Sequence, residues 1–297
     1  MTRKAYIQLH AAILLAAFSS IFGNLVSLDA VLTTWYRMLF ACAILLAIHV
    51  ARRRSISISR RDTRTIANGA ILALHWVMFY ASIKYANVSV GVVCFCLSSF
   101  FTAIIAPLIG RRRFSPVELA LSSLTLAGIS LIFHFDSSFR AGITFGVISA
   151  LLFAIYTTLN ETANSPGGAD DAMRTTMLQM GGGSVALALL MPIYARWQHT
   201  TVGISDPMDF LYLALLALAC TVAMCTLLNK AQKRISAFTV SISFNLEPIY
   251  SIVLAIVIFN EHRMLGASFY AGLLMIAGSL LLQMYHVSRT SRAAAKP

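Results

Sequence analysis

The sequence predicts an all-α polytopic membrane protein, with ten transmembrane helices arranged as two inverted five-helix repeats. Hydrophobic residues make up 58% of the 297 residues and charged residues only 11%, with a mean hydropathy of +0.77. Soluble domains carry about 25% charged residues, so the surface of this chain must be covered largely by lipid. Long apolar stretches recur along the whole chain. The charge of the short segments between them differs between the two halves in the way that inverted repeats require.

Ten apolar stretches are long enough to cross a bilayer, which takes about 20 residues of α-helix. The connections between them are short and leave no room for a sizeable soluble domain. The first stretch is too long for the apolar part of a signal peptide, so we expect it to remain as a span. The triple glycine at 181–183 is expected to weaken or bend the seventh helix. The ten ranges are 5–28, 31–51, 65–85, 88–109, 116–135, 141–163, 172–195, 208–229, 236–259 and 264–286.

The distribution of basic residues predicts the orientation of these spans. If the N-terminus is cytoplasmic, the inside segments hold 18 of the 23 lysines and arginines and the outside segments hold four, while Arg37 lies within a span. An excess of basic residues marks the cytoplasmic side. We therefore expect both termini in the cytoplasm of a bacterium and the spans in its inner membrane. The net charge of +12 is spread over short clusters and forms no basic face for nucleic acid.

Two pairs of turns indicate that the halves are inverted. The turn "GRRRF" (110–114) after the fourth span corresponds, 150 residues later, to "NEHRM" (260–264) after the ninth. In the loop before each of these turns the second half has more basic residues than the first: "KYANVS" (84–89) has one and "NKAQKRIS" (229–236) has three. Five spans per half place equivalent turns on opposite sides of the membrane. The predicted units are a first repeat at 5–135, an inverted second repeat at 141–286 and a cytoplasmic tail at 287–297.

Three segments also resemble a known family. They are "WYRMLFACAILL" (35–46), "YASIKYANVSVGVV" (80–93) and "LEPIYSIVLAIVIFNEHR" (246–263), and they are similar to the EamA branch of the drug/metabolite transporter superfamily. Arg37, Glu247, Pro248 and Glu261 carry most of this resemblance, which covers 10–133 and 143–283. It implies ten helices in inverted halves and export or exchange of small metabolites such as amino acids. This chain departs from the family at "LSSFF" (97–101) and "GRRRF", where members often have a proline and then an acidic residue.

Glu247 is the sharpest candidate for a functional group. An ionisable side chain at the bilayer centre is costly and should face a cavity or a partner. Thr239 and Ser243 precede Glu247 at four-residue spacing, which places all three on one helix face, and Asn245 belongs to a second polar line beside it. Pro248 removes a backbone hydrogen bond and frees a carbonyl about one turn earlier. One interpretation is a site that binds an amine or carries a proton, and the other is a buried acid neutralised by Arg37 or by protonation.

Other polar and aromatic residues extend this candidate site. Arg37 has two interpretations, a clamp on the end of its helix or a ligand for a substrate carboxylate. His75, Trp76, Phe79 and Tyr80 are expected to form an aromatic wall that contacts a flat or cationic ligand, although such residues also pack against neighbours or lie at the interface. Polar stripes on the fourth and sixth spans add Ser98, Tyr156 and Asn160, for which hydrogen bonding between helices is the alternative to substrate binding.

The function predicted from these features is a secondary transporter that exports or exchanges small polar metabolites by alternating access. Its partners are the small-molecule substrate and membrane lipid, and proton coupling and oligomeric state are left open. Motifs of metalloproteases, serine hydrolases and P-loop proteins are missing from the sequence, and the five cysteines match no metal-binding spacing, so neither cofactor nor metal is predicted. The alternatives are an intramembrane enzyme on a lipid-linked substrate and a scaffold or channel that does not transport.

Overall fold

The computed structural model describes residues 2–53, 58–60, 62–109, 114–134, 139–163, 172–198, 202–204, 206–261 and 266–294, and the regular secondary structure in these ranges is helical. The helices are α1 (Thr2–Leu25), α2 (Ala30–Ala51), α3 (Asp62–Tyr85), α4 (Val88–Phe95), α5 (Leu97–Ile109), α6 (Pro116–His134), α7 (Arg140–Ala163), α8 (Ala172–Gln198), α9 (Pro207–Ala217), the π-helical turn η2 (Leu218–Ala223), α10 (Met224–Gln232), α11 (Ala237–Phe244), α12 (Glu247–Phe259) and α13 (Ala267–Ala294). The turns 111–113 and 262–264, on which part of the inversion argument rests, lie outside the described residues.

Eight helical segments within the described ranges are long and apolar enough to cross a membrane. Three of them combine consecutive elements, namely α4 with α5, α9 with η2 and α10, and α11 with α12. The predicted spans 116–135 and 264–286 coincide with α6 and α13, whose apolar stretches are shorter, Leu119–Leu131 and Phe269–Ser279. The structure therefore supports eight membrane-crossing helices, and the count of ten stays a prediction. The predicted tail 287–297 begins inside α13, which continues to Ala294.

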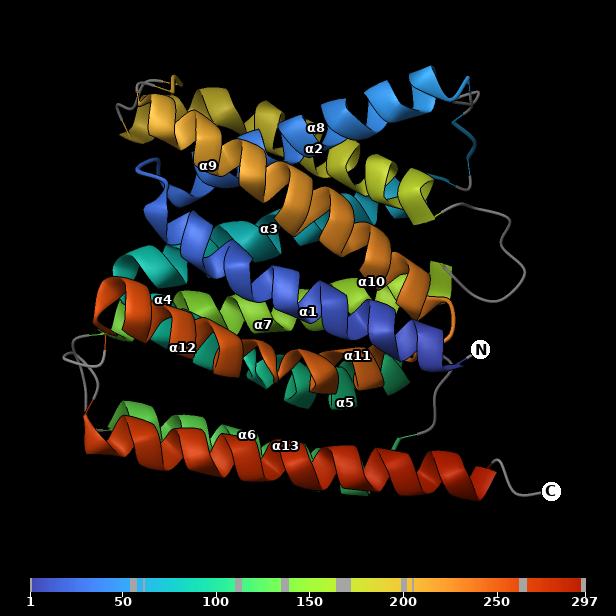
Figure 1. Ribbon diagram of the computed structural model, residues 1–297, viewed down its shortest axis with the longest axis vertical. Helices are drawn as coiled ribbons and strands as arrows, with labels where there is room; N and C mark the ends of the chain where they lie inside the picture. The colour runs from blue at the N-terminus through green and yellow to red at the C-terminus, as the bar shows by residue number, and fades with distance from the viewer. Residues whose placement is uncertain are drawn as a thin grey trace.

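The helices lie side by side as one bundle (Figure 1). α1 begins and α13 ends at the same end of this bundle, which we call the termini end, and α5, α7 and α10 also end there. The pair α6 and α13 forms one edge, and α2, α8 and α9 form the other. The largest hydrophobic core lies between the central helices, where side chains of α1, α3, α4, α7, α10 and α11 meet.

Glycines allow the central helices to approach closely. A Cβ atom on Gly69 would lie 2.1 Å from the backbone oxygen of Gln179, and one on Gly182 would lie 2.2 Å from that of Ile66. α8 runs without interruption through its triple glycine and packs closely against α3 there. The predicted weakening or bending stays a prediction. The small residues Gly142 and Gly146 pack against α3 and α4 in the same way, as their spacing predicts.

Two helices are broken near the middle of the bundle. α11 ends at Phe244 and α12 begins at Glu247, because Pro248 has no N–H to donate to the Phe244 carbonyl. α4 and α5 are separated at Cys96 although that segment has no proline. There the Cys96 N–H donates to the Val93 carbonyl at 3.1 Å, a bond of tighter, 3₁₀ spacing. The broken helices pack together, α4 against α12 and α5 against α11.

Carboxylates bind the N-terminal ends of both broken helices. Glu261 is buried and accepts hydrogen bonds from Val88 N at 2.9 Å, Ser89 N at 3.0 Å and Ser89 Oγ at 2.5 Å. Glu161 accepts one from Ala237 N at 2.9 Å at the start of α11. A negative charge at this position satisfies free N–H groups and interacts favourably with the helix dipole. Glu261 therefore has a structural role in the turn where the resemblance places it.

Candidate functional site

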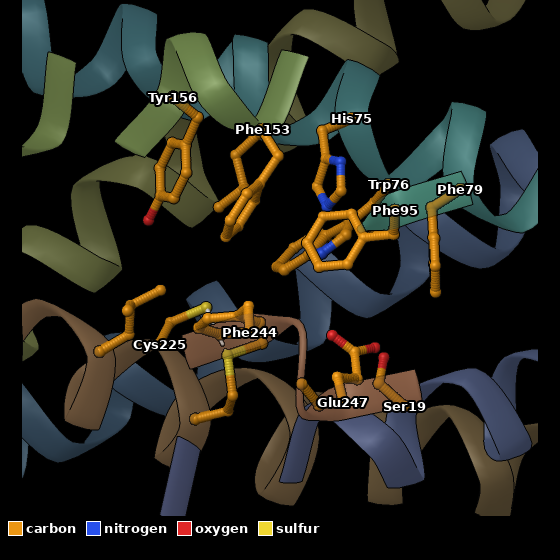
Figure 2. A pocket seen from close by; sticks show the side chains of 14 residues that line it. Ser19, His75, Trp76, Phe79, Phe95, Phe153, Tyr156, Cys225, Phe244 and Glu247 are labelled. Atoms are coloured by element: carbon orange, nitrogen blue, oxygen red, sulfur yellow. Dashed lines mark hydrogen bonds between the residues drawn. The ribbon is translucent and has the colours of Figure 1, made fainter. Parts of the chain in front are cut away.

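A cavity lies where the two halves of the chain meet (Figure 2). Figure 2 shows His75, Phe153 and Tyr156 reaching into it from one side and Glu247, Ser19 and Phe244 from the other. Its walls come from α1, α3, α4, α7, α10, α11 and α12. The lining residues are Ala16, Ser19, Leu72, His75, Trp76, Phe79, Phe95, Phe153, Tyr156, Met224, Cys225, Leu228, Phe244 and Glu247.

Aromatic rings fill the centre of this cavity. Phe95 and Phe244 are the last residues of α4 and α11, so the two helix breaks place their rings there. The Phe153 ring lies between them, with centroid distances of 4.7 Å to Phe95 and 5.3 Å to Phe244. The volume open to the centres of water molecules is about 30 Å³, enough for about two waters. A metabolite can therefore enter only if these rings move.

His75 lies on the α3 wall of the cavity, as the aromatic-wall prediction requires. Its Nδ1 is 2.9 Å from both the backbone oxygen and the Oγ of Ser149 on α7. Its ring centroid lies 5.1 Å from that of Phe153 and 5.4 Å from that of Phe95. Trp76 and Phe79 line the cavity beside it. The contact of Nδ1 with Ser149 fixes the orientation of the imidazole, and the other ring nitrogen points toward the cavity (Figure 2).

Glu247 is the acidic residue among those that line the cavity. It begins α12 directly after the helix break and is 3% exposed. Within the described part of the chain, no hydrogen bond or ion pair reaches its carboxyl group, and Figure 2 shows this group facing the pocket beside Ser19. A carboxylate without a partner in an apolar cavity is costly. A proton, a cationic ligand or the buried positive charge of Arg37 would offset this cost.

Arg37 lies behind the cavity wall and is fully buried. Its Nε donates to Thr221 Oγ1 at 2.6 Å, and its Nη2 donates to the Cys220 carbonyl at 2.5 Å. Its Nη1 donates to Ser19 Oγ at 2.9 Å and to Tyr80 Oη at 2.5 Å. Among the described residues these partners are uncharged. The guanidinium thus links α1, α2, α3 and η2, and only Ser19 of the four residues it binds lines the cavity.

Two features of the Arg37 environment connect it to the cavity. The guanidinium carbon lies 3.7 Å from the centroid of the Trp76 ring, a cation–π contact with a residue that lines the cavity. The Cys220 carbonyl belongs to the π-helical turn η2, whose extra residue per turn leaves carbonyls free for other donors. The Thr221 hydroxyl also bonds the Leu216 carbonyl at 2.7 Å.

The structure places the remaining predicted residues outside the cavity, apart from Tyr156. Tyr80 binds Arg37 and Ser19. Ser98 lies buried on α5, and Asn245 Nδ2 donates to Ser99 Oγ at 3.2 Å in the break between α11 and α12. Asn160 belongs to a cluster of carboxamides beyond Tyr156. Their predicted contact with substrate has no support from this arrangement and stays a prediction.

Several lining residues could not be recognised from the sequence. Ser19, Phe95, Phe153, Cys225 and Phe244 lie in apolar stretches where a phenylalanine or a serine is as typical of lipid contact or helix packing as of a binding site. The position of Phe244 four residues before Pro248 was the one available signal, because a proline at that distance marks a helix break. For the others, only the packing of the helices decides that they meet.

Comparisons with known proteins agree with this architecture. The model of the EamA-like transporter family matches residues 3–134 and 140–287 as two copies. A solved structure titled "Crystal structure of protein" is similar with a TM-score of 0.68 and 16% sequence identity, over 96% of this chain and 98% of that one. No match was found among curated proteins. Because the family match covers nearly the whole chain in two repeats, this multi-pass membrane protein belongs to the EamA-like transporter family.

Proposed function

We propose that the protein is a secondary transporter that exports or exchanges small polar metabolites by alternating access in a bacterial inner membrane. In this proposal ten spans form two inverted repeats, 5–135 and 141–286, and both termini are cytoplasmic. The substrates are amino acids or related amphiphilic compounds. The observation that carries the proposal is the cavity between the two halves, where one carboxyl group without a bonded partner in the described part of the chain faces a wall of aromatic rings.

The packing of the helices supports the inverted repeats. In the two repeats α3 corresponds to α10 and α1 corresponds to α7. α3 packs against α7, and α10 likewise packs against α1. The equivalent helices α2 and α8 contact each other, as do α6 and α13. The helix break at 245–246 follows the break at Cys96 by 149 to 150 residues, which matches the offset of 150 residues between equivalent turns of the two halves. Transporters built from inverted repeats hold their substrate near the midplane, where broken helices meet.

The chemistry of the cavity favours a substrate with a cationic group and an apolar body. Glu247 would bind an ammonium group, and His75, Phe95 and Phe153 would stack against the apolar part. A proton and the substrate amine would neutralise the Glu247 carboxylate alternately, because they compete for the same group. This competition would couple transport of the substrate to movement of a proton in the opposite direction. We assign Arg37 a positioning role, because its donors hold Ser19 and its guanidinium supports the Trp76 ring.

Transport in reconstituted proteoliposomes tests this proposal. A panel of amino acids and amphiphilic amines is presented with and without a pH gradient, and protein-free vesicles serve as the control. We expect at least one amine-bearing compound to cross faster in the presence of protein. If none does, with or without the gradient, transport of this class is wrong. The enzymatic alternative predicts chemical conversion of a lipid-linked compound instead, and the channel alternative predicts flux that does not saturate.

The variant Glu247→Gln tests the role of the carboxyl group. Glutamine keeps the size and polarity of the side chain but can neither bind a proton nor pair with an ammonium group as an ion. We expect transport to fall about tenfold or more, since a hydrogen bond to a charged group is worth about 1.5–3 kcal/mol, and the residual rate to lose its dependence on pH between about pH 5 and 8. Asp206→Asn, at an exposed helix cap, is the matched control. Normal transport by Glu247→Gln across this range would exclude Glu247 as the coupling group.

A further inference from the structure

A second buried polar cluster lies next to the cavity, and the proposed substrate site does not use it. It consists of the carboxamides of Asn160 on α7, Gln179 on α8, and Asn229 and Gln232 on α10, together with the Thr176 hydroxyl on α8. These five side chains are nearly or completely inaccessible to solvent. We call them the carboxamide cluster. Polar side chains in membrane bundles commonly form hydrogen bonds between helices, and here five of them join three helices at one place.

The cluster joins α10 to α7 and α8 by hydrogen bonds between side chains. Asn160 Nδ2 donates to Asn229 Oδ1 at 2.7 Å and also to Gln232 Oε1. Asn229 Nδ2 donates to Thr176 Oγ1 at 3.0 Å and to Gln179 Oε1 at 3.2 Å. Gln179 Nε2 donates to Asn160 Oδ1 at 2.8 Å, which connects α7 to α8. All but this last bond must break if α10 moves away from α7 and α8.

The cluster lies between the cavity and the termini end of the bundle. Tyr156 lines the cavity and donates from its hydroxyl to Gln179 Oε1 at 3.4 Å, and Leu228 of the lining directly precedes Asn229. Asn160 follows Tyr156 by one helical turn, about 6 Å further toward the termini end. Gln232 is the last residue of α10, and both α7 and α10 end at the termini end (Figure 1).

The helices on the two sides of the cluster differ in their most extensive packing partners. α3 packs against both α7 and α8, and an ion pair between Asp62 and Arg174, 2.8 Å between Oδ2 and Nη2, ties α3 to α8. α10 packs most extensively against α1, with a smaller contact to α8, and α1 packs against α12. Met224, Cys225 and Leu228 on α10 form one wall of the cavity, and Phe153 and Tyr156 on α7 form the facing wall. Separation of α10 from α7 and α8 would therefore open the cavity.

We propose that the carboxamide cluster is the closure of the transport pathway at the termini end, and that Tyr156 couples this closure to the cavity. The inference rests on the proposed transport function. Interhelical hydrogen bonds within membranes are individually weak, so several together hold the closed state while remaining able to separate. Carboxamides both donate and accept, so incoming water replaces each lost partner as α10 moves. A ligand that displaces the Tyr156 phenol removes its bond to Gln179 and weakens the closure.

Cys225 provides a reporter for this closure that does not depend on transport. In a background where Cys42, Cys94, Cys96 and Cys220 are replaced by alanine, Cys225 is the remaining thiol, and it lines the cavity. A membrane-impermeant methanethiosulfonate is added to proteoliposomes on one side at a time. A tag on the C-terminus identifies the side that carries the termini. The measured quantity is the rate at which Cys225 is modified from each side.

The test variant is Asn229→Leu, which keeps the size of the side chain and removes three hydrogen bonds of the cluster. We expect modification of Cys225 from the termini side to become at least about tenfold faster, because three interhelical bonds are lost together, with no change from the other side. Thr125→Val is the matched control, since it removes the buried bond of 2.9 Å between Thr125 and Ser279 that joins α6 to α13. An unchanged rate in Asn229→Leu, or an equal increase from both sides, overturns the proposal.

A second pair of substitutions decides the question if the leucine variant does not fold. Asn160→Cys and Asn229→Cys are combined in a background without other cysteines and joined by a short bifunctional methanethiosulfonate. Because both substitutions remove hydrogen bonds of the cluster, transport by the joined protein is compared only with transport by the same variant after reduction. We expect transport to stop while the two residues are joined and to resume after reduction. Full transport while joined overturns the closure. If the unmodified protein moves no substrate at all, the transport proposal fails, and the rate of Cys225 modification still decides whether the cluster closes the cavity.

Discussion

At the scale of single residues, Arg37 and Glu247 share the centre of the bundle but differ in how their charge is satisfied. Arg37 donates four hydrogen bonds to uncharged groups and lies against the Trp76 ring. Glu247 faces the cavity with no bonded partner in the described part of the chain. The sequence singles out both residues, because an ionisable side chain in an apolar stretch is conspicuous. It does not reveal that the partners of Arg37 are a serine, a tyrosine, a threonine and a backbone carbonyl.

The positioning role of Arg37 predicts that lysine cannot replace it. Lysine keeps the positive charge, but its single ammonium group cannot reproduce the planar arrangement of donors that reaches α1, α3 and η2. We expect Arg37→Lys to lower the free energy of unfolding by about 1.5–3 kcal/mol, the typical value of one hydrogen bond to a charged group, and to lower the thermal midpoint in detergent. Arg196→Lys, at an exposed position of α8, serves as control. Equal midpoints for Arg37→Lys and the unmodified protein would contradict this role.

At the scale of the elements, the two helix breaks position the aromatic rings of the cavity. The break before Glu247 follows from Pro248, and the sequence predicts it. The break at Cys96 has no proline, and the segment 88–109 reads as one continuous apolar helix. η2 likewise gives no signal in the sequence, because a π-helical turn depends on the partners of its carbonyls, and here Cys220 binds Arg37 from another helix. Irregularities that depend on tertiary partners are invisible to local patterns.

Close packing of α3 against α8 leads to a prediction with an internal control. A Cβ atom at Gly69 would lie 2.1 Å from a backbone oxygen, whereas one at Gly278 on α13 meets no atom within 4 Å. We expect Gly69→Ala to destabilise the protein by about 1–3 kcal/mol, the usual cost of overpacking. Gly278→Ala is expected to be neutral or to stabilise α13 by up to about 1 kcal/mol. Thermal unfolding of both variants in the same detergent measures the difference, and a stable Gly69→Ala would show that α3 and α8 are packed less tightly.

At the scale of the whole molecule, the bundle brings side chains from residues 16–95 and 153–247 to one cavity. In the proposed transport cycle the carboxamide cluster closes the termini end of this arrangement, and its separation would open the cavity to that side.

The inverted arrangement predicts the sides from which two turns can be reached. α5 ends at the termini end of the bundle and α12 at the opposite end (Figure 1), so we expect the segments that follow them on opposite sides of a membrane. Single cysteines introduced as Arg112→Cys and His262→Cys, in a background free of other cysteines, are labelled from each side with an impermeant reagent. We expect the first to react from the side of the termini and the second from the other side. Reaction of both from one compartment would refute the inversion.

The sequence by itself determines that this chain is a helical membrane protein of two similar halves, because apolar stretches of about 20 residues and the basic segments between them are local properties. It also identifies Glu247, since a charge within an apolar stretch needs no neighbour to be noticed. Only the tertiary structure decides which residues surround that charge. Helix packing brings Ser19, Phe95 and Phe153 to the cavity and takes Asn160 away from it, and Asn160 joins carboxamides up to 72 residues distant in the chain. Such contacts depend on how the helices lie against one another, which no local pattern records.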